Sequence, residues 1–163
     1  TFSIICFNLQ KESVKNCALE YKRQVFMKKI PRSDCPISFA LDFFGDKWSL
    51  LVMRDLVFEG KRFYKEFLQS KEGIATNVLS DRLKKLEKLG VIRSQVYEKL
   101  KTQKEYSLTP KGIALVPILV EVIIWSTKYE SGLAVAPAFL TQLTQDKERV
   151  VARINARLSG TDV

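Results

Sequence analysis

Hydrogen-bonding and basic side chains gather between residues 76 and 104, and they are the groups in this sequence best suited to bind an anion. On a helical period of 3.6 residues, Leu79, Leu83 and Leu86 fall on one side of segment 76–89 and polar groups on the other. The polar side begins with small hydrogen-bonding residues, which suit base edges or phosphates, and then becomes basic. The candidate binding residues are Thr76, Asn77, Ser80, Arg82, Lys84, Lys85, Lys88, Lys101 and Lys104.

The positive charge of the chain is concentrated around these candidates. Residues 61 to 105 include twelve basic and six acidic side chains, a balance of +6 out of a net charge of +9. Such a surface favours an anionic partner, most often nucleic acid, with a membrane surface or simple solubility as alternatives. Because an isolated amphipathic helix is more often a plain solvated surface helix, the neighbouring elements must decide.

The absence of certain residue types argues against an enzyme. The sequence contains no histidine and only three cysteines, Cys6, Cys17 and Cys35. It therefore lacks the usual general base near neutral pH, Ser-His and Cys-His nucleophiles, and His-ligated zinc. The cysteines are too far apart for a Cys-x-x-Cys site, and no glycine-rich phosphate loop is present. We expect no catalysis, no metal and no cofactor.

The N-terminal residues 1–30 are predicted to lie outside the core fold. They are either an N-terminal extension or a start-site artefact, since MKKIPRSDCP from Met27 looks like an ordinary bacterial translation start. The opening TFSIICF has no basic segment before it and no cleavage site after it, so it is a poor signal peptide. No stretch approaches the roughly 18 to 20 uninterrupted apolar residues of a membrane helix. We expect a cytoplasmic protein with no membrane partner.

Hydrophobic spacing and helix-ending residues predict the elements that position the basic groups. Ile37, Ala40, Leu41 and Phe44 are spaced as the inner face of a helix that begins at 36. The elements predicted after it are an internal helix at 46–60, a short helix at 62–70, a glycine turn at 71–74 and the helix 76–89. Two strands follow at 91–97 and 104–109, on either side of a basic tip at 98–103. The C-terminal part is predicted to contain a long helix that is capped by Thr109 and has a kink or break at Pro117, then a loop at 134–139 and one last helix at 139–158.

Two short helices joined by a glycine turn and followed by a two-stranded ribbon make a winged helix-turn-helix. We therefore predict a mainly α fold with a small β-hairpin: a winged helix-turn-helix DNA-binding domain at 31–130 with flanking dimerisation helices. Helix 76–89 would lie in the major groove of DNA, and the wing at 98–104 against the minor groove or the backbone. Arg82 either contacts phosphate or bridges to a residue such as Glu66, and Lys101 and Lys104 either contact DNA or form a solvated tip.

The predicted long helix has a wider apolar face than one small domain needs to cover. A second copy of the chain is the natural partner, because paired half-sites in DNA need paired readers. We expect this face to form a dimer interface together with the C-terminal loop and helix at 131–163. The candidate interface residues are Leu119, Val122, Ile123 and Trp125.

The residues from Cys35 to about Trp125 resemble the HxlR-type winged-helix transcriptional regulators of bacteria. The likeness rests on CPISFALDFFGDKWSLLVMRDL, RFYKEF, VLSDRLKKLEKLGVI and EYSLTPKGIALVPIL. It implies a homodimeric, DNA-binding repressor or activator, in many cases with an N-terminal cysteine that senses oxidants or electrophiles. The chain departs from the family in having Ala75 at the cap of the recognition helix and KTQ, Lys101 to Gln103, in place of Pro-Pro at the wing tip.

The resemblance places the reactive cysteine of the family at Cys35. Since Pro36 suits the first helical position, Cys35 falls at the N-cap, where free backbone N–H groups and the helix dipole would stabilise a thiolate. Arg32 would help and Asp34 would oppose this effect. The alternative is a buried cysteine that acts as a small hydrophobic residue.

Two classes of function are consistent with the sequence. The first is a dimeric transcriptional regulator that binds a palindromic operator in double-stranded DNA and answers a small-molecule or oxidant signal. The second is a winged-helix module that binds protein or RNA without specific DNA readout, with the basic patch serving solubility. The salt dependence of binding to random duplex DNA separates them, because a protein that tracks phosphates loses affinity steeply as salt rises.

Overall fold

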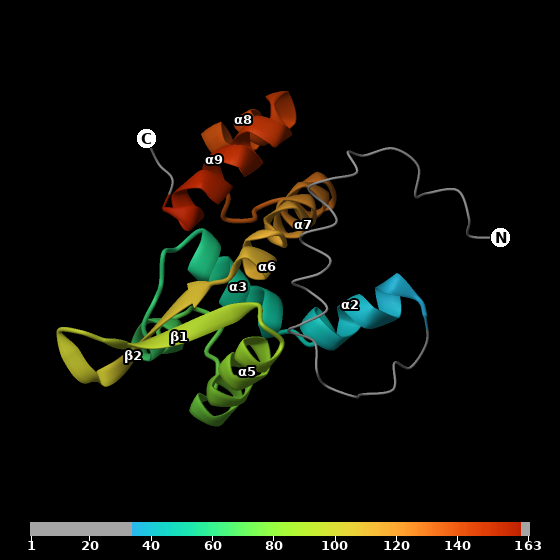
Figure 1. Cartoon of the computed structure of the whole chain (residues 1–163). Coiled ribbons are helices and arrows are strands. Elements are labelled where there is room, and N and C mark those ends of the chain that lie inside the picture. Colours follow the sequence, from blue (N-terminus) through green and yellow to red (C-terminus); the bar gives the residue numbers. More distant parts are fainter. Residues whose placement is uncertain (1–33, 161–163) are drawn as a thin grey trace, which may run out of the picture. The chain divides into compact units, whose positions relative to one another are not determined.

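The computed structural model describes residues 34–160 and leaves 1–33 and 161–163 aside. The chain divides between Arg32 and Ser33, and all described elements belong to the second unit. The proposed start at Met27, together with Cys6 and Cys17, lies outside the described residues. The described elements are, in chain order, α2 (Pro36–Phe44), α3 (Ser49–Val57), α4 (Tyr64–Leu68), α5 (Thr76–Lys88), β1 (Ile92–Tyr97), β2 (Leu100–Leu108), α6 (Pro110–Ile113), α7 (Val116–Tyr129), α8 (Pro137–Gln145) and α9 (Lys147–Ser159) (Figure 1).

Helix α2 begins where the sequence predicts, but it turns a different face inward. Pro36 occupies the first turn and Cys35 the N-cap. Phe43 is the buried residue of this helix, whereas Ile37 and Leu41 are 70% and 48% exposed. The predicted inner face is therefore wrong, although Phe44 does pack against the core.

Helices α4 and α5, joined by the glycine turn, form the helix-turn-helix, and α3 packs against α5. Helix α3 begins at Ser49 rather than at Asp46, and it buries Val52 and Leu56 among other residues, as its apolar sequence predicts. Gly73 ends the turn before α5 with a φ of +64°, a value that an L side chain rarely adopts. Helix α5 buries all three predicted leucines.

The wing is an antiparallel hairpin of β1 and β2, with a shorter turn than the sequence predicts. Ile92 pairs with Leu108, and the ladder continues to Val96 opposite Lys104 before its register shifts. Strand β2 already begins at Leu100, so Lys101 and Lys104 lie within a strand rather than at a tip. The predicted tip at 98–103 is reduced to the two residues between the strands.

The predicted long helix is broken, as Pro117 indicates, into α6 and α7. Thr109 caps α6 through its hydroxyl oxygen, which accepts a hydrogen bond from the Gly112 amide at 3.2 Å. Segment 110–129, which spans both helices, is the one described stretch that is long and apolar enough to cross a membrane by length and composition, with a mean hydropathy of 1.5. Lys111, Glu121 and Lys128 interrupt it, so it is not the uninterrupted apolar run whose absence the sequence indicates. Core helices of soluble proteins meet the same criterion, and α7 buries Val116, Leu119 and Val120.

The C-terminal segment forms two helices, α8 and α9, and not the single helix predicted at 139–158. Helix α8 begins at Pro137, so the predicted loop at 134–139 is shorter too. Asp146 breaks the run, and its carboxylate caps α9 by accepting a hydrogen bond from the Arg149 amide at 3.0 Å. Leu143, Val150 and Ile154 join the same hydrophobic core as the helix-turn-helix, so α8 and α9 are a layer of one body (Figure 1).

Candidate DNA-binding surface

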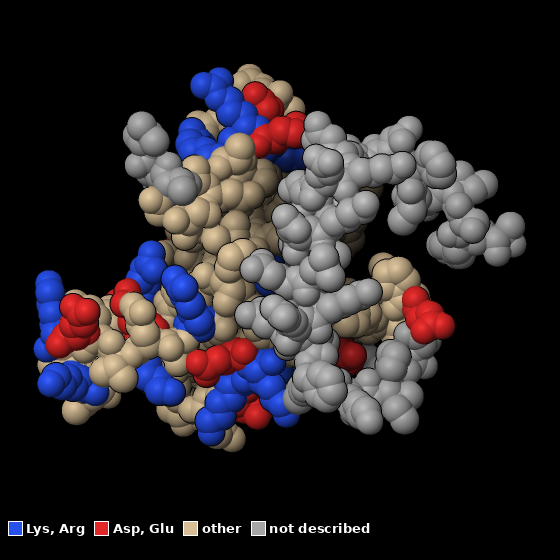
Figure 2. All heavy atoms as spheres, viewed as in Figure 1, with Lys and Arg blue, Asp and Glu red and all other residues tan. Residues whose placement is uncertain are grey.

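Helix α5 has one polar face that is open to solvent. Its leucines Leu79, Leu83 and Leu86 are almost completely buried, which fixes the opposite side toward solvent. Figure 2 shows basic side chains over α5 at the lower edge of the view and over the hairpin at the left, with acidic ones between them. The exposed side chains of this helix are Thr76, Asn77, Asp81, Lys84 and Lys88.

Ser80 lies at one flank of this open face and is tied to α4. Its hydroxyl shares a hydrogen bond of 3.0 Å with the Tyr64 hydroxyl. The Tyr64 hydroxyl also donates to the carbonyl oxygen of Thr76 at 2.7 Å. Ser80 is therefore half-buried and already has a protein partner, so a DNA contact would have to share that hydroxyl.

Arg82 and Lys85 lie at the other flank and are paired with an acidic residue from outside the helix. The Arg82 guanidinium donates to the Asp46 carboxylate at 2.9 Å, and the Lys85 ammonium group does so at 3.3 Å. Arg82 also pairs with Asp81. The sequence proposed Glu66 as the partner of Arg82, but the Glu66 carboxylate instead accepts from the backbone amides of Arg62 and Phe63.

Asp46 is ionised strongly enough to hold both cations. Burial by itself raises the pKa of this carboxyl, but hydrogen bonds from the Ser49 hydroxyl and amide, from Arg82 and from the Trp48 amide outweigh burial. Together they lower the pKa from 3.8 to about 2. Asp46 therefore carries a full negative charge at neutral pH beside the basic helix.

A second carboxylate, Asp55, holds the other end of α3 against the turn of the motif. It is 2% exposed and accepts hydrogen bonds from Arg54 at 2.6 Å, from Lys61 at 3.0 Å and from the Ser70 hydroxyl. Arg54 also hydrogen bonds to Glu72 and lowers the pKa of that carboxyl from 4.5 to about 2. No local sequence pattern indicates this cluster, because Ser70 is 15 residues from Asp55 and Glu72 is 18 residues from Arg54.

Lys101 and Lys104 are exposed on β2, where they extend the basic surface from α5 onto the wing. Val96 and Leu100 are also exposed there, at 58% and 52%. These two apolar residues were not among the predicted sites, although apolar side chains in an otherwise polar hairpin were a visible signal. Among residues 34–160, no group of three or more His, Cys, Asp or Glu could hold a metal ion.

Comparison with known proteins gives this arrangement a family. Residues 43–133, more than half of the chain, match the model of the HxlR-like helix-turn-helix proteins. The chain belongs to this family of transcriptional regulators. The sequence-based resemblance, the winged-helix fold and the class of function are thereby confirmed.

Individual relatives of this HxlR-like chain are also named as helix-turn-helix transcriptional regulators. An uncharacterized helix-turn-helix transcriptional regulator of Synechocystis is 40% identical over 86 residues, which are 53% of this chain and 63% of that protein. YdeP of Bacillus subtilis is 34% identical over 99 residues, 61% of this chain and 77% of its own length. These proteins are named as regulators and not as enzymes.

Two solved structures are similar to this HxlR-like chain. The putative transcription factor PA1607 superposes with a TM-score of 0.55 at 40% identity, covering 65% of this chain and 70% of that one. The redox regulator HypR in its oxidized form superposes with a TM-score of 0.53 at 31% identity, covering 60% of this chain and 99% of its own.

The outer face of α7 in this HxlR-like protein is apolar and open. Val122 and Trp125 are 44% and 65% exposed, and Ile118 and Tyr129 extend the same stripe. Helices α8 and α9 both pack against α7 and leave this stripe uncovered. Of the predicted interface residues, Leu119 instead lies in the hydrophobic core of the chain, since it is 5% exposed. Ile123 is half-buried.

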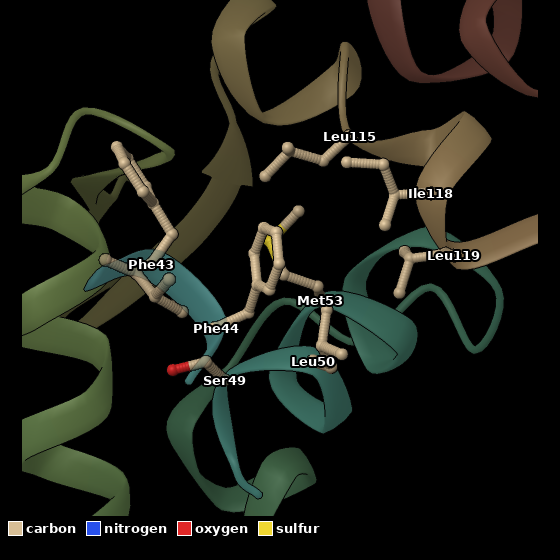
Figure 3. A pocket seen from close by; sticks show the side chains of 9 residues that line it. Phe43, Phe44, Ser49, Leu50, Met53, Leu115, Ile118 and Leu119 are labelled. Atoms are coloured by element: carbon tan, nitrogen blue, oxygen red, sulfur yellow. The ribbon is translucent and has the colours of Figure 1, made fainter. Parts of the chain in front are cut away.

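Cys35 is exposed at the N-cap of α2. This contradicts the alternative of a buried small hydrophobic residue. Its side chain makes no capping hydrogen bond to α2. From the far end of α2, Phe43 and Phe44 line a small apolar pocket together with Met53 of α3 and Leu115 beyond α6 (Figure 3).

The same pocket is also lined by α5 and α7. Leu86 of α5 is one of its lining residues, as are Ile118 and Leu119 of α7. Ser49 supplies the one hydroxyl group of the lining, and that hydroxyl donates to Asp46 at 2.7 Å. The pocket is therefore an apolar joint that is lined by side chains of α2, α3, α5 and α7.

Proposed function

We propose that this protein is a dimeric regulator that reads a specific DNA sequence with α5 and contacts the flanking backbone or minor groove with its wing. One observation carries this proposal: the second helix of a helix-turn-helix buries its leucines and presents Asn77, Lys84 and Lys88 to solvent. Asparagine can bond an adenine edge through two hydrogen bonds, and lysine neutralises phosphates. We propose that the protein acts in the cytoplasm, because the similar regulators of Synechocystis and Bacillus subtilis are bacterial and bacterial DNA lies in the cytoplasm.

The contacts divide by exposure. Thr76 and Asn77, at the start of α5, are assigned to base edges, and Lys84 and Lys88 to phosphates. Lys101 and Lys104 are assigned to the backbone or minor groove beside the wing. Ser80, Arg82 and Lys85 can reach DNA only by sharing or leaving the protein partners that they already have.

The open stripe of α7 is proposed to bind a second copy of the chain. Val122 and Trp125 are central to it, with Ile118 and Tyr129 at its ends. An exposed apolar patch of this kind commonly marks a protein interface. A two-fold dimer would bind a palindromic operator whose half-sites are roughly 10 bp apart, or a multiple of that distance.

Cys35 is proposed to control DNA binding through oxidation. A peroxide would oxidise its thiolate to a sulfenic acid and be reduced to water or an alcohol. A second thiol, from a small molecule or from the partner subunit, would then form a disulfide and release water. The exposure of Cys35 supports this, as does the 31% identity to the redox regulator HypR. Movement of α2 would reach α5 through the apolar joint.

The oxidation proposal is tested by measuring operator binding with and without the thiol oxidant diamide, in the presence of a small thiol. We expect diamide to change the affinity of the unmutated protein and to leave Cys35→Ser unchanged. An unmutated protein whose operator binding ignores diamide, or a Cys35→Ser variant that responds equally, would remove Cys35 from the proposal.

The main proposal is tested by selecting bound fragments from a pool of genomic DNA, followed by salt titration on random duplex DNA. We expect a palindromic motif to be enriched and log Kd to depend steeply on log salt, by about 0.9 per phosphate neutralised. Recovery of no common motif together with a flat salt dependence would contradict DNA readout and favour the alternative of a protein- or RNA-binding module.

A further inference from the structure

Asp46 lies in the turn between α2 and α3, and its carboxylate is fixed in place by α3. One oxygen, Oδ1, accepts hydrogen bonds from the backbone amides of Trp48 at 3.0 Å and of Ser49 at 2.9 Å. The other, Oδ2, accepts from the Ser49 hydroxyl at 2.7 Å. These bonds cap the first turn of a helix whose Val52 and Met53 are buried in the core. The position of the carboxylate is therefore set by the core.

The oxygen Oδ2 also holds the recognition helix. It accepts from Arg82 at 2.9 Å and from Lys85 at 3.3 Å. These two cations are three residues apart on α5 and therefore lie on the same side of the helix. Their side chains are only 21% and 33% exposed. One flank of α5 is thus attached to α3.

The opposite flank of α5 is attached to α4. There the Tyr64 hydroxyl bonds to the Ser80 hydroxyl and to the Thr76 carbonyl oxygen. On a helical period of 3.6 residues, Ser80 lies on one side of the leucine stripe and Arg82 on the other. A helix held on both flanks cannot rotate about its axis without breaking one set of bonds.

We propose that Asp46 is a positioning residue for DNA readout: the buried leucines decide which side of α5 faces solvent, and Asp46, through Arg82 and Lys85, holds the helix in its final rotation about its own axis. This inference rests on the proposed function. It has two consequences. Asn77 faces the bases only in the rotation that Asp46 holds, and Lys84 and Lys88 are the phosphate contacts of α5, while Arg82 and Lys85 stay with the protein.

Asp46→Asn is the variant that separates these roles. An asparagine oxygen can still accept from the Trp48 and Ser49 amides, so the cap of α3 is retained. Its amide group would face Arg82 and Lys85 and would not attract them. We expect tighter binding to random duplex DNA, because two cations are released. We expect the ratio of operator affinity to random-DNA affinity to fall by about fivefold or more, since α5 is no longer held on its Arg82 flank.

Asp81→Asn is the matched control. Asp81 is exposed on α5, also pairs with Arg82, and is not attached to α3. Its replacement removes the same charge from the same region. We expect this variant to raise affinity for operator and random DNA alike, with an unchanged ratio. An equal loss of the ratio in both variants would reduce the role of Asp46 to simple charge and overturn the inference.

The second consequence is tested by comparing Lys84→Ala with Lys85→Ala on random DNA. Lys84→Ala should reduce the slope of log Kd against log salt by about 0.9, the loss of one phosphate contact. Lys85→Ala should leave that slope unchanged. Equal reductions in the two variants would show that Asp46 does not retain Lys85.

The outcomes distinguish this inference from the function on which it rests. If the unmutated protein prefers no DNA sequence, the proposed function fails and the role of Asp46 falls with it. If the unmutated protein prefers its operator and Asp46→Asn keeps the full preference, only the inference fails. A thermal melt of each variant accompanies the binding data, and a preference lost only in proportion to unfolded protein would mark Asp46 as merely structural.

Discussion

Helices α5 and α7 each bury one apolar stripe in the same core, yet their open faces differ in chemistry. The open face of α5 carries Asn77, Lys84 and Lys88, whereas that of α7 carries Val122 and Trp125. A charged face is already stable in water and recruits an anion when one approaches. Exposing an apolar face of that extent to water is unfavourable in free energy, and a protein partner that covers it removes this cost. The difference therefore supports the proposal that α5 binds DNA and that α7 binds a second subunit.

The inner and outer sides of α7 offer the largest contrast. Leu119→Asp should unfold the protein, because a buried charge without a partner costs several kcal/mol, about the whole stability of a small domain. Val122→Asp, three residues away, should leave the chain folded and melting well above Leu119→Asp, since Val122 is 44% exposed. Circular dichroism melts compare the two variants. Similar melting temperatures would contradict the burial of Leu119 and the exposure of Val122.

The next effect concerns assembly. Val122→Asp combined with Trp125→Asp should convert the dimer to a folded monomer and abolish cooperative operator binding, because two charges would be placed in the interface. Sedimentation at micromolar concentration measures the mass. Thr141→Asp, which adds a charge on the exposed side of α8, serves as the control and should remain dimeric. A monomeric unmutated protein would contradict the assignment of α7.

A smaller effect is expected on α5. Asn77→Ala should weaken operator binding by about 1 to 3 kcal/mol and relax the sequence preference at one position. Affinity for random duplex DNA should hardly change, because that affinity depends on phosphates. Fluorescence anisotropy with operator and random duplexes measures both values. Equal losses on the two duplexes would show that Asn77 does not read bases.

The smallest effect is the pH dependence of the contact that holds α5. The pKa of Asp46 is lowered to about 2 in the folded protein. A carboxyl with a lowered folded pKa stabilises the fold above its unfolded pKa of about 4, and that contribution is lost as the pH falls toward 2. Asp46→Asn should therefore melt lower than the unmutated protein at neutral pH. The gap should close between about pH 4 and pH 2, and a gap that stays constant over this range would contradict the assigned pKa.

Local features of the sequence predicted much of the fold. The spacing of Leu79, Leu83 and Leu86 is enough to identify the inner side of α5, because polar residues occupy its other positions. Thr109 is a cap because its hydroxyl reaches an amide three residues later, which is a local geometry. Pro117 and Gly73 act through their own backbone restrictions. Each of these signals depends on neighbours within one helical turn.

The remaining decisions were made by tertiary structure. Helix α2 itself has apolar residues on nearly all of its sides, so their spacing alone could not identify Phe43, rather than Ile37 or Leu41, as the buried residue. Spacing alone also could not predict that Leu119 is buried and Val122 exposed, because the packing of α8 and α9 decides which side of α7 is covered.

The partner of Arg82 is 36 residues distant, at Asp46. A local pattern cannot identify a contact that exists only once two separate helices pack together. The sequence by itself thus determined the helix-turn-helix and the basic character of its second helix. Packing determined which of those basic groups remain open to DNA, because exposure depends on what the rest of the chain covers.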